Sequence, residues 1–207
     1  MVYIPESLLD EVENLKESWN FDEAIQIVNK ILSRDPSNED AILQIADIQY
    51  RKGDISKADK AVDFLNSKRD HNDPLGLYIK GLLEMEKNNW KEAKKYLSKA
   101  MELTDGKNHE IVRCYGLCEY RYGNRSKGLD FLLDAFAIES KDAEVVYNLI
   151  QVYILEQDYK KAKEMIKYFN KHIDSLKVID KEISYYQKKI SLFEKFLAAK
   201  NKFHIKK

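Results

Sequence analysis

Apolar positions along the chain recur at helical spacing, in pairs of short segments separated by polar breaks. The clearest pair spans residues 147–169, with the sequence YNLIQVYILEQDYKKAKEMIKYF. Apolar side chains fall on one helical face before the polar residues 156–158 and on one face again after them. The residues on these faces are Leu149, Ile150 and Tyr153, then Tyr159, Ala162, Ile166 and Phe169. This segment therefore predicts one helical hairpin.

The same hairpin pattern occurs five times. A small residue opens the second helix of each copy, and successive copies are 34, 35, 35 and 34 residues apart, at Ala24, Ala58, Ala93, Gly128 and Ala162. Apolar residues follow four and seven positions later, on the same helical face. One hairpin cannot bury its own apolar face and must stack on a neighbour, so a fixed period of this length predicts an all-α helical solenoid.

The first helices also carry a regular position, twelve residues before each of these small residues. It is occupied by Val12, Ala46, Gly81, Gly116 and Ile150. Together with the alanine that opens the second helix and with Pro36 at the end of the first copy, this pattern resembles the tetratricopeptide repeat (TPR). The aromatic residue usual early in the first helix is absent, and Leu8, Ile42, Leu77, Val112 and Val146 stand there instead.

The resemblance covers residues 5–172. It implies a right-handed α-α superhelix of about five TPR-like hairpins, with repeats at about 5–38, 39–72, 73–107, 108–142 and 143–172. After residue 172 the pattern changes to an apolar seam with steps of four and three, formed by Ile179, Ile183, Tyr186, Ile190, Phe193 and Leu197. We expect residues 173–200 to form a capping helix over the fifth repeat, followed by a basic tail at 201–207. The alternative is a coiled coil that pairs two copies into a homodimer.

Charge is balanced overall, with 35 basic and 35 acidic residues, so no global field favours nucleic acid or an anionic membrane. The balance hides a gradient. Residues 1–70 carry 9 basic and 15 acidic residues, whereas residues 141–207 carry 15 basic and 9 acidic ones. The chain begins with acidic residues rather than a basic leader, and no apolar run approaches the roughly 18 residues of a membrane span. We therefore predict a cytoplasmic location without membrane insertion.

No residue pattern typical of catalysis occurs. The four histidines are scattered, and neither a phosphate-binding glycine loop nor a nucleophile motif is present. A metal site from His109, Cys114 and Cys118 is the alternative to ordinary packing, which we favour because Cys114 and Cys118 lie four apart on one predicted helix. Paired lysines such as Lys94 and Lys95 are interleaved with acids, as on a solvated helix face, so nucleic-acid binding is the less favoured interpretation. We expect no enzymatic activity, cofactor or metal.

The TPR resemblance implies that the first helices line a concave groove that binds a peptide. Helical spacing from the packed positions predicts the groove residues as Leu43, Asp47, Tyr50, Tyr78, Leu82, Met85, Arg113, Leu117, Tyr120, Tyr147, Gln151 and Ile154. Uncovered aromatic side chains are typical of binding surfaces, although some of these tyrosines could instead pack between repeats. We expect Tyr78→Ala or Tyr120→Ala to weaken binding by about 2 kcal/mol without harming the fold.

These expectations describe a non-catalytic protein-interaction scaffold. Acidic residues in the first two repeats predict that the bound partner is basic at that end and apolar in the middle. The alternative is a self-assembling structural protein that uses the C-terminal helix or stacking of repeat ends.

Overall fold

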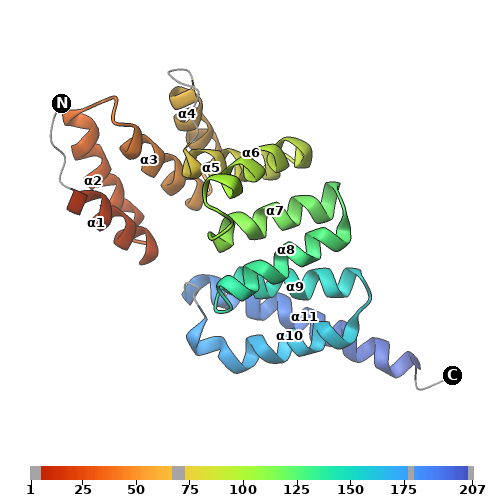
Figure 1. Ribbon diagram of the computed structural model, residues 1–207. Helices are drawn as coiled ribbons and strands as arrows, with labels where there is room; N and C mark the ends of the chain where they lie inside the picture. The colour runs from red at the N-terminus through yellow and green to blue at the C-terminus, as the bar shows by residue number, and fades with distance from the viewer. Residues whose placement is uncertain (1–5, 67–72, 177–179, 205–207) are drawn as a thin grey trace. The chain divides into compact units, whose positions relative to one another are not determined.

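The computed structural model describes residues 6–66, 73–176 and 180–204. These residues form eleven α-helices and one short 3₁₀ helix (Figure 1). The helices are α1 Glu6–Glu17, α2 Phe21–Arg34, α3 Glu39–Arg51, α4 Ile55–Asn66, α5 Pro74–Glu86, α6 Trp90–Leu103, α7 His109–Tyr122, α8 Arg125–Ile138, α9 Ala143–Leu155, α10 Tyr159–His172 and α11 Asp180–His204, with η1 at Ile173–Ser175. The expectation of an all-α helical-repeat fold is confirmed.

Contacts divide the chain into two compact units at Gly106, between the third and fourth hairpins. Unit 1 contains the hairpins α1–α2, α3–α4 and α5–α6, and within it α1 packs on α3 and α3 packs on α5. Unit 2 contains α7–α8 and α9–α10, followed by α11, which packs on both α9 and α10. No helix in the described ranges is both long and apolar enough to cross a bilayer.

The hairpin turns share one backbone conformation. Trp19, Gly53, Asn88 and Gln157 each adopt a positive φ, between 59° and 80°, five residues before the small residue that opens the following helix. Only glycine enters this left-handed region without steric cost, so three of the four turns hold a non-glycine residue there against its preference. The fourth hairpin differs, because Gly123 has φ −126° and ψ −125°.

Asparagine or aspartate precedes nearly every helix. Before α3, α5, α7 and α9 the side chains of Asn38, Asp73, Asn108 and Asp142 accept hydrogen bonds from free backbone N–H groups of the first turn. Such a cap contributes about 1 kcal/mol to a helix. Asx residues also stand before each second helix, at Asn20, Asp54, Asn89, Asn124 and Asp158. This is a further repeat marker, and it accounts for the uniform starting points of the helices.

The core follows the predicted spacing. Ala24, Ala58, Ala93 and Ala162 are fully buried, and Gly128 is buried at the equivalent place. All residues four and seven positions later are also buried, namely Val28, Val62, Leu97, Leu132 and Ile166, and Ile31, Leu65, Ala100, Ala135 and Phe169. The second helix of each hairpin therefore places one narrow apolar face against its partner, and the small first residue permits close approach.

The C-terminal helix α11 lies with its apolar seam against its own chain. Tyr186, Ile190 and Leu197 are buried, and Phe193 is partly buried. Ile179 lies outside the described residues, and the side chain of Ile183 is not described. Because α11 contacts α9 and α10, the described part of the seam covers the last hairpin and is not exposed to a second copy.

Candidate functional site

The predicted groove residues fall into two groups by burial. Six are partly exposed on the first helices of the two units, and these are Tyr50, Met85, Leu117, Tyr147, Gln151 and Ile154. The other six are buried, and these are Leu43, Asp47, Tyr78, Leu82, Arg113 and Tyr120. The expectation of an uncovered surface is therefore wrong for the second group, in which Tyr78 and Tyr120 are only 7% and 5% exposed.

A buried charge cluster joins α1 to α3 in unit 1. The Lys16 ammonium lies 2.6 Å from Asp47 Oδ2 and donates to Gln44 Oε1 at 2.6 Å and to Glu13 Oε1 at 2.9 Å. Gln44 Nε2 donates to the same Glu13 oxygen at 2.6 Å, and Arg51 Nε pairs with Asp47 Oδ1 at 3.0 Å. Two cations therefore face two carboxylates, and the cluster is formally neutral.

This pairing changes the charge expected for the partner. Asp47 is one of the acids of the first two repeats that would attract a basic partner end, but it is 2% exposed and is paired with both Lys16 and Arg51. A carboxylate so neutralised contributes little field to the surface. The cluster instead joins two adjacent first helices, α1 and α3. Removing either Lys16 or Asp47 would leave the other charge buried without its partner, which lowers the stability of the fold.

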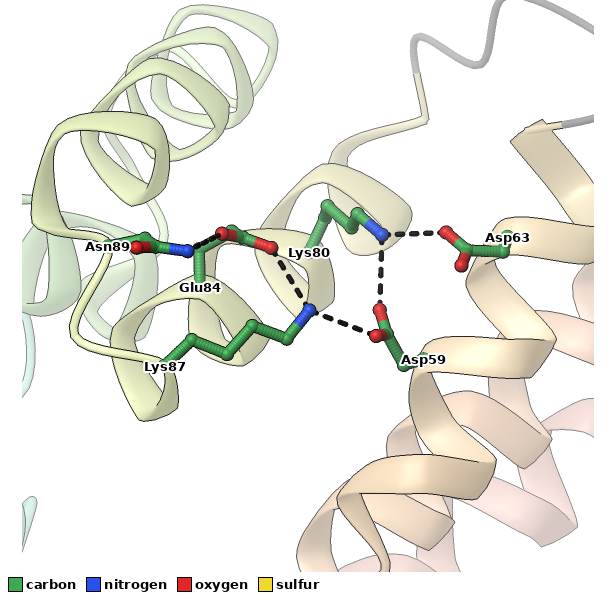
Figure 2. Close-up of polar contacts among 6 residues, drawn as sticks. All are labelled: Asp59, Asp63, Lys80, Glu84, Lys87 and Asn89. Carbon is green, nitrogen blue, oxygen red and sulfur yellow. Dashed lines mark hydrogen bonds and ion pairs between the residues drawn. The ribbon is translucent and has the colours of Figure 1, made fainter.

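A second polar network joins the second hairpin to the third. Figure 2 shows Lys80 of α5 between Asp59 Oδ1, at 3.1 Å, and Asp63 Oδ1, at 2.7 Å, which lie four residues apart on α4. Lys87 bridges Asp59 Oδ2 and Glu84 Oε1 at 2.9 and 3.2 Å. Burial alone would raise the pKa of Asp59, but hydrogen bonds from Lys87 and Lys80 outweigh it and lower that pKa.

Sequence reasoning missed both networks. Each contains lysines and acids that look like ordinary solvated helix residues in the sequence, and their partners lie on a different helix. The one available signal is the pair Asp59 and Asp63, because two like charges four residues apart on a helix repel each other and favour a neighbouring cation.

In unit 2 the buried polar groove residues bind to their own chain. Tyr120 of α7 donates its hydroxyl to Glu156 Oε1, at 2.6 Å, just after the last residue of α9. Burial and this hydrogen bond raise the pKa of Tyr120 to about 12. Arg113 pairs with Glu144 Oε2 at 2.6 Å. Both side chains thus link α7 to α9, which explains why they are buried rather than presented to a ligand.

Tyr147 of α9 faces α11. Its ring centroid lies 5.2 Å from that of Tyr186 and 6.0 Å from that of Phe193, and its hydroxyl accepts a hydrogen bond from Gln151 Nε2 at 3.1 Å. These are ordinary aromatic packing distances. Helix α11 therefore covers the part of α9 that the sequence predicted to be open. Apart from Tyr147, the apolar groove candidates of unit 2 that remain partly exposed are Leu117 and Ile154.

The three residues considered for a metal site make different interactions in the fold. Cys114 and Cys118 are buried free thiols, and burial raises the pKa of Cys114 to about 12, which disfavours the thiolate that metals bind. His109 Nε2 lies 2.9 Å from Asp142 Oδ2, and this pairing raises the pKa of His109. Among the described residues no group of three or more potential ligands could hold a metal ion.

Comparison with known proteins places the chain among helical-repeat proteins. A family model described as the TT21 fifth ARM repeats domain matches residues 15–109. A TPR repeat-containing protein of Methanocaldococcus jannaschii is 26% identical over 145 residues, which is 69% of this chain. The chain spans about a quarter of the length of that relative, since the match covers 25% of it.

Solved structures show the same fold at low sequence identity. A thermophilic TPR protein of Thermus thermophilus matches with a TM-score of 0.69 and 17% identity, over 90% of this chain and 98% of that one. Pseudomonas aeruginosa pilF matches with a TM-score of 0.64 and 16% identity, over 97% and 90%. YrrB, a TPR protein described as having an unusual peptide-binding site, matches with a TM-score of 0.51 and 21% identity, over 90% and 92%. The resemblance inferred from the repeat pattern is supported by these matches.

Proposed function

Because the chain is a helical-repeat protein of the tetratricopeptide type, we propose that it is a non-catalytic scaffold that binds a peptide segment of a protein partner on its first helices. The observation that carries the proposal is the set of partly exposed apolar side chains that remain there after packing. In unit 1 these are Tyr50 of α3 and Met85 of α5, and in unit 2 they are Leu117 of α7 and Ile154 of α9.

These four side chains occupy related places in successive copies. Tyr50, Met85 and Ile154 share one repeat position, and Leu117 lies one helical turn before the corresponding Tyr120. A tyrosine supplies a large contact area to a peptide at low conformational cost. An unbranched methionine can adapt its shape to the peptide. The peptide-binding site described for YrrB gives independent support for this use of the fold. Unlike our sequence-based expectation, the proposal assigns no basic end to the partner, because Glu13 of α1 and Asp47 of α3 are paired within the chain.

A peptide-display selection on the purified chain, followed by fluorescence anisotropy with a selected synthetic peptide, tests the proposal. Tyr50→Ala or Met85→Ala should weaken binding of a peptide held by unit 1 by about 1–2 kcal/mol, and Leu117→Ala or Ile154→Ala should do so for unit 2. Tyr122→Ala is the matched control, because Tyr122 is 55% exposed on α7 but lies away from the predicted groove face. Unchanged affinity of all four variants would contradict the proposal.

The variants Tyr78→Ala and Tyr120→Ala no longer suit this purpose. Both side chains are buried, so truncation would leave cavities and cost about 3–5 kcal/mol of stability, as for large aromatic residues in protein cores. Loss of binding in such variants would report unfolding. The self-assembly alternative likewise loses its strongest support, because the described seam of α11 is packed within the chain.

A further inference from the structure

Helix α11 carries a second apolar stripe on a face that its own chain covers only in part. Tyr185, Leu192 and Phe196 are 52%, 54% and 41% exposed, and they account for three of the nine large hydrophobic side chains exposed on the described residues. At 100° per residue they fall within about 40° of one another around the helix, roughly 110° from the buried seam. Exposed apolar groups gathered on one helical face mark an interaction surface, whereas single scattered ones do not.

The outer stripe has the spacing of a helix–helix contact. Lys189 and Ala199 lie in the same row. The full row is Tyr185, Lys189, Leu192, Phe196 and Ala199, at steps of four, three, four and three. This is the spacing with which one helix packs along another. A single lysine within such a row fixes the register of the two paired helices, because an acid of the partner helix must lie opposite it. The surface is therefore suited to a partner helix rather than to an extended strand.

Charge around the outer stripe determines what kind of helix fits. Residues 184–200 contain four lysines, at 188, 189, 195 and 200, and one acid, Glu194. Lys188 and Lys195 flank the stripe on one side, while Lys189 and Lys200 lie over its rings, at 5.4 Å from the Tyr185 centroid and 6.0 Å from that of Phe196. Glu194 lies on the far side of the helix and accepts a hydrogen bond from Asn170 at 3.0 Å.

We propose that this outer face of α11 docks an acidic amphipathic helix of another protein, with apolar residues against Leu192 and Phe196 and carboxylates against Lys188, Lys189 and Lys195. Tyr159 of α10 extends the apolar floor, since its ring packs against Phe196 at 6.0 Å between centroids. A second copy of this chain is a poor occupant. Two outer stripes would bring lysine rows together, and like charges at such flanking positions oppose pairing.

The probe is a designed peptide of about three to four heptads with leucine at the seam positions and glutamate at the flanking ones. The fluorescence anisotropy of this labelled peptide is measured as the full chain is added at low salt. The control is an otherwise identical peptide in which lysine replaces glutamate. Only the acidic peptide should bind. Leu192→Asp should weaken its binding at least tenfold and Lys195→Glu several-fold, whereas Leu103→Asp should not, although Leu103 is 48% exposed on α6.

Thermal melts accompany each variant, and should Leu192→Asp fail to fold, the double variant Lys188→Glu, Lys195→Glu carries the same test. Equal binding of both peptides, or of neither, overturns the proposal. The proposal is also overturned if the chain binds phosphatidylserine-containing vesicles through Leu192 and binds no peptide. It is overturned as well if light scattering gives a dimeric mass that Leu192→Asp makes monomeric. The groove variants Tyr50→Ala and Ile154→Ala should leave acidic-peptide binding unchanged, so this surface and the proposed groove can fail independently.

Discussion

Replacing Gly128 by alanine should destabilise the fourth hairpin, although alanine is the better helix former. A Cβ atom at residue 128 would lie 2.4 Å from the backbone nitrogen of Tyr120 and 2.6 Å from its Cα, where ordinary contacts begin near 3.4 Å. Because backbone atoms cannot rotate away, α7 and α8 would have to separate by about 1 Å to restore ordinary contact. Gly116 adds to this closeness, since its own Cβ would lie 3.1 Å from the carbonyl oxygen of Gly128.

The expected magnitude is a balance of two effects. Overpacking costs about 1–3 kcal/mol, and the upper part of that range applies where the obstacle is backbone. Against this cost, the higher helix propensity of alanine stabilises α8 by about 1 kcal/mol. The net loss is about 1–2 kcal/mol, and for a chain of this size it lowers Tm by about 2–8 °C.

Gly76→Ala is the matched control. Its Cβ would meet the Leu43 Cδ2 methyl at 3.1 Å and Asp73 Oδ2 at 3.6 Å, and the leucine side chain can turn aside. This variant should melt at or slightly above the parent temperature. Urea unfolding followed by circular dichroism, with amide hydrogen exchange in α7 and α8, measures both variants. A Gly128→Ala protein that melts with the parent would refute the close approach of these helices.

Three further predictions concern polar and aromatic contacts. Lys16→Met should cost about 3–5 kcal/mol in urea unfolding because Asp47 is left buried beside one cation, whereas Lys95→Met, which breaks the exposed pair with Glu92, should cost under about 1 kcal/mol; similar losses would argue against the buried cluster. His109 has a raised pKa because Asp142 hydrogen-bonds to it, so the pair stabilises the fold fully below the ordinary value of 6.5 and less as pH rises through the raised pKa. The parent should therefore lose Tm relative to His109→Gln above pH 6.5, and parallel Tm profiles would contradict this. Tyr147→Ala removes two ring contacts of about 0.5–1.5 kcal/mol each and should speed amide exchange in α11, while Leu192→Ala on the outer stripe should not; equal exchange in both would mean that Tyr147 does not hold α11.

The hairpin architecture could be predicted from sequence because its signals are local and repeated. A small residue such as Ala24 or Ala93 and the apolar residues four and seven positions later are all decided within one helix, and five copies confirm one another. The Asx residue that precedes each helix from α2 to α10 is an equally regular signal, and it locates the helix starts as well as the hydrophobic pattern does.

Burial on the first helices could not be predicted in the same way. Tyr120 and Tyr50 hold the same position in their repeats, and each donates its hydroxyl to a glutamate 36 residues later, Glu156 and Glu86, yet Tyr120 is buried while Tyr50 stays partly exposed. Which one is covered depends on contacts between residues more than thirty positions apart, and spacing within a helix contains no such information. Asp47 shows the same limit, since its charge is visible in the sequence but its pairing with Lys16 is not.

Helix α11 shows why the two apolar faces of one helix require different explanations. The stronger seam, with Ile190 and Leu197, dominates the sequence pattern and is used internally against α9 and α10. Once that seam is buried, an exposed residue such as Leu192 no longer contributes to capping, so its exposure needs a separate cause. The lysines beside it would be equally well solvated without any apolar neighbour. A basic, partly apolar face that does not serve the fold is therefore best explained by an acidic partner outside it.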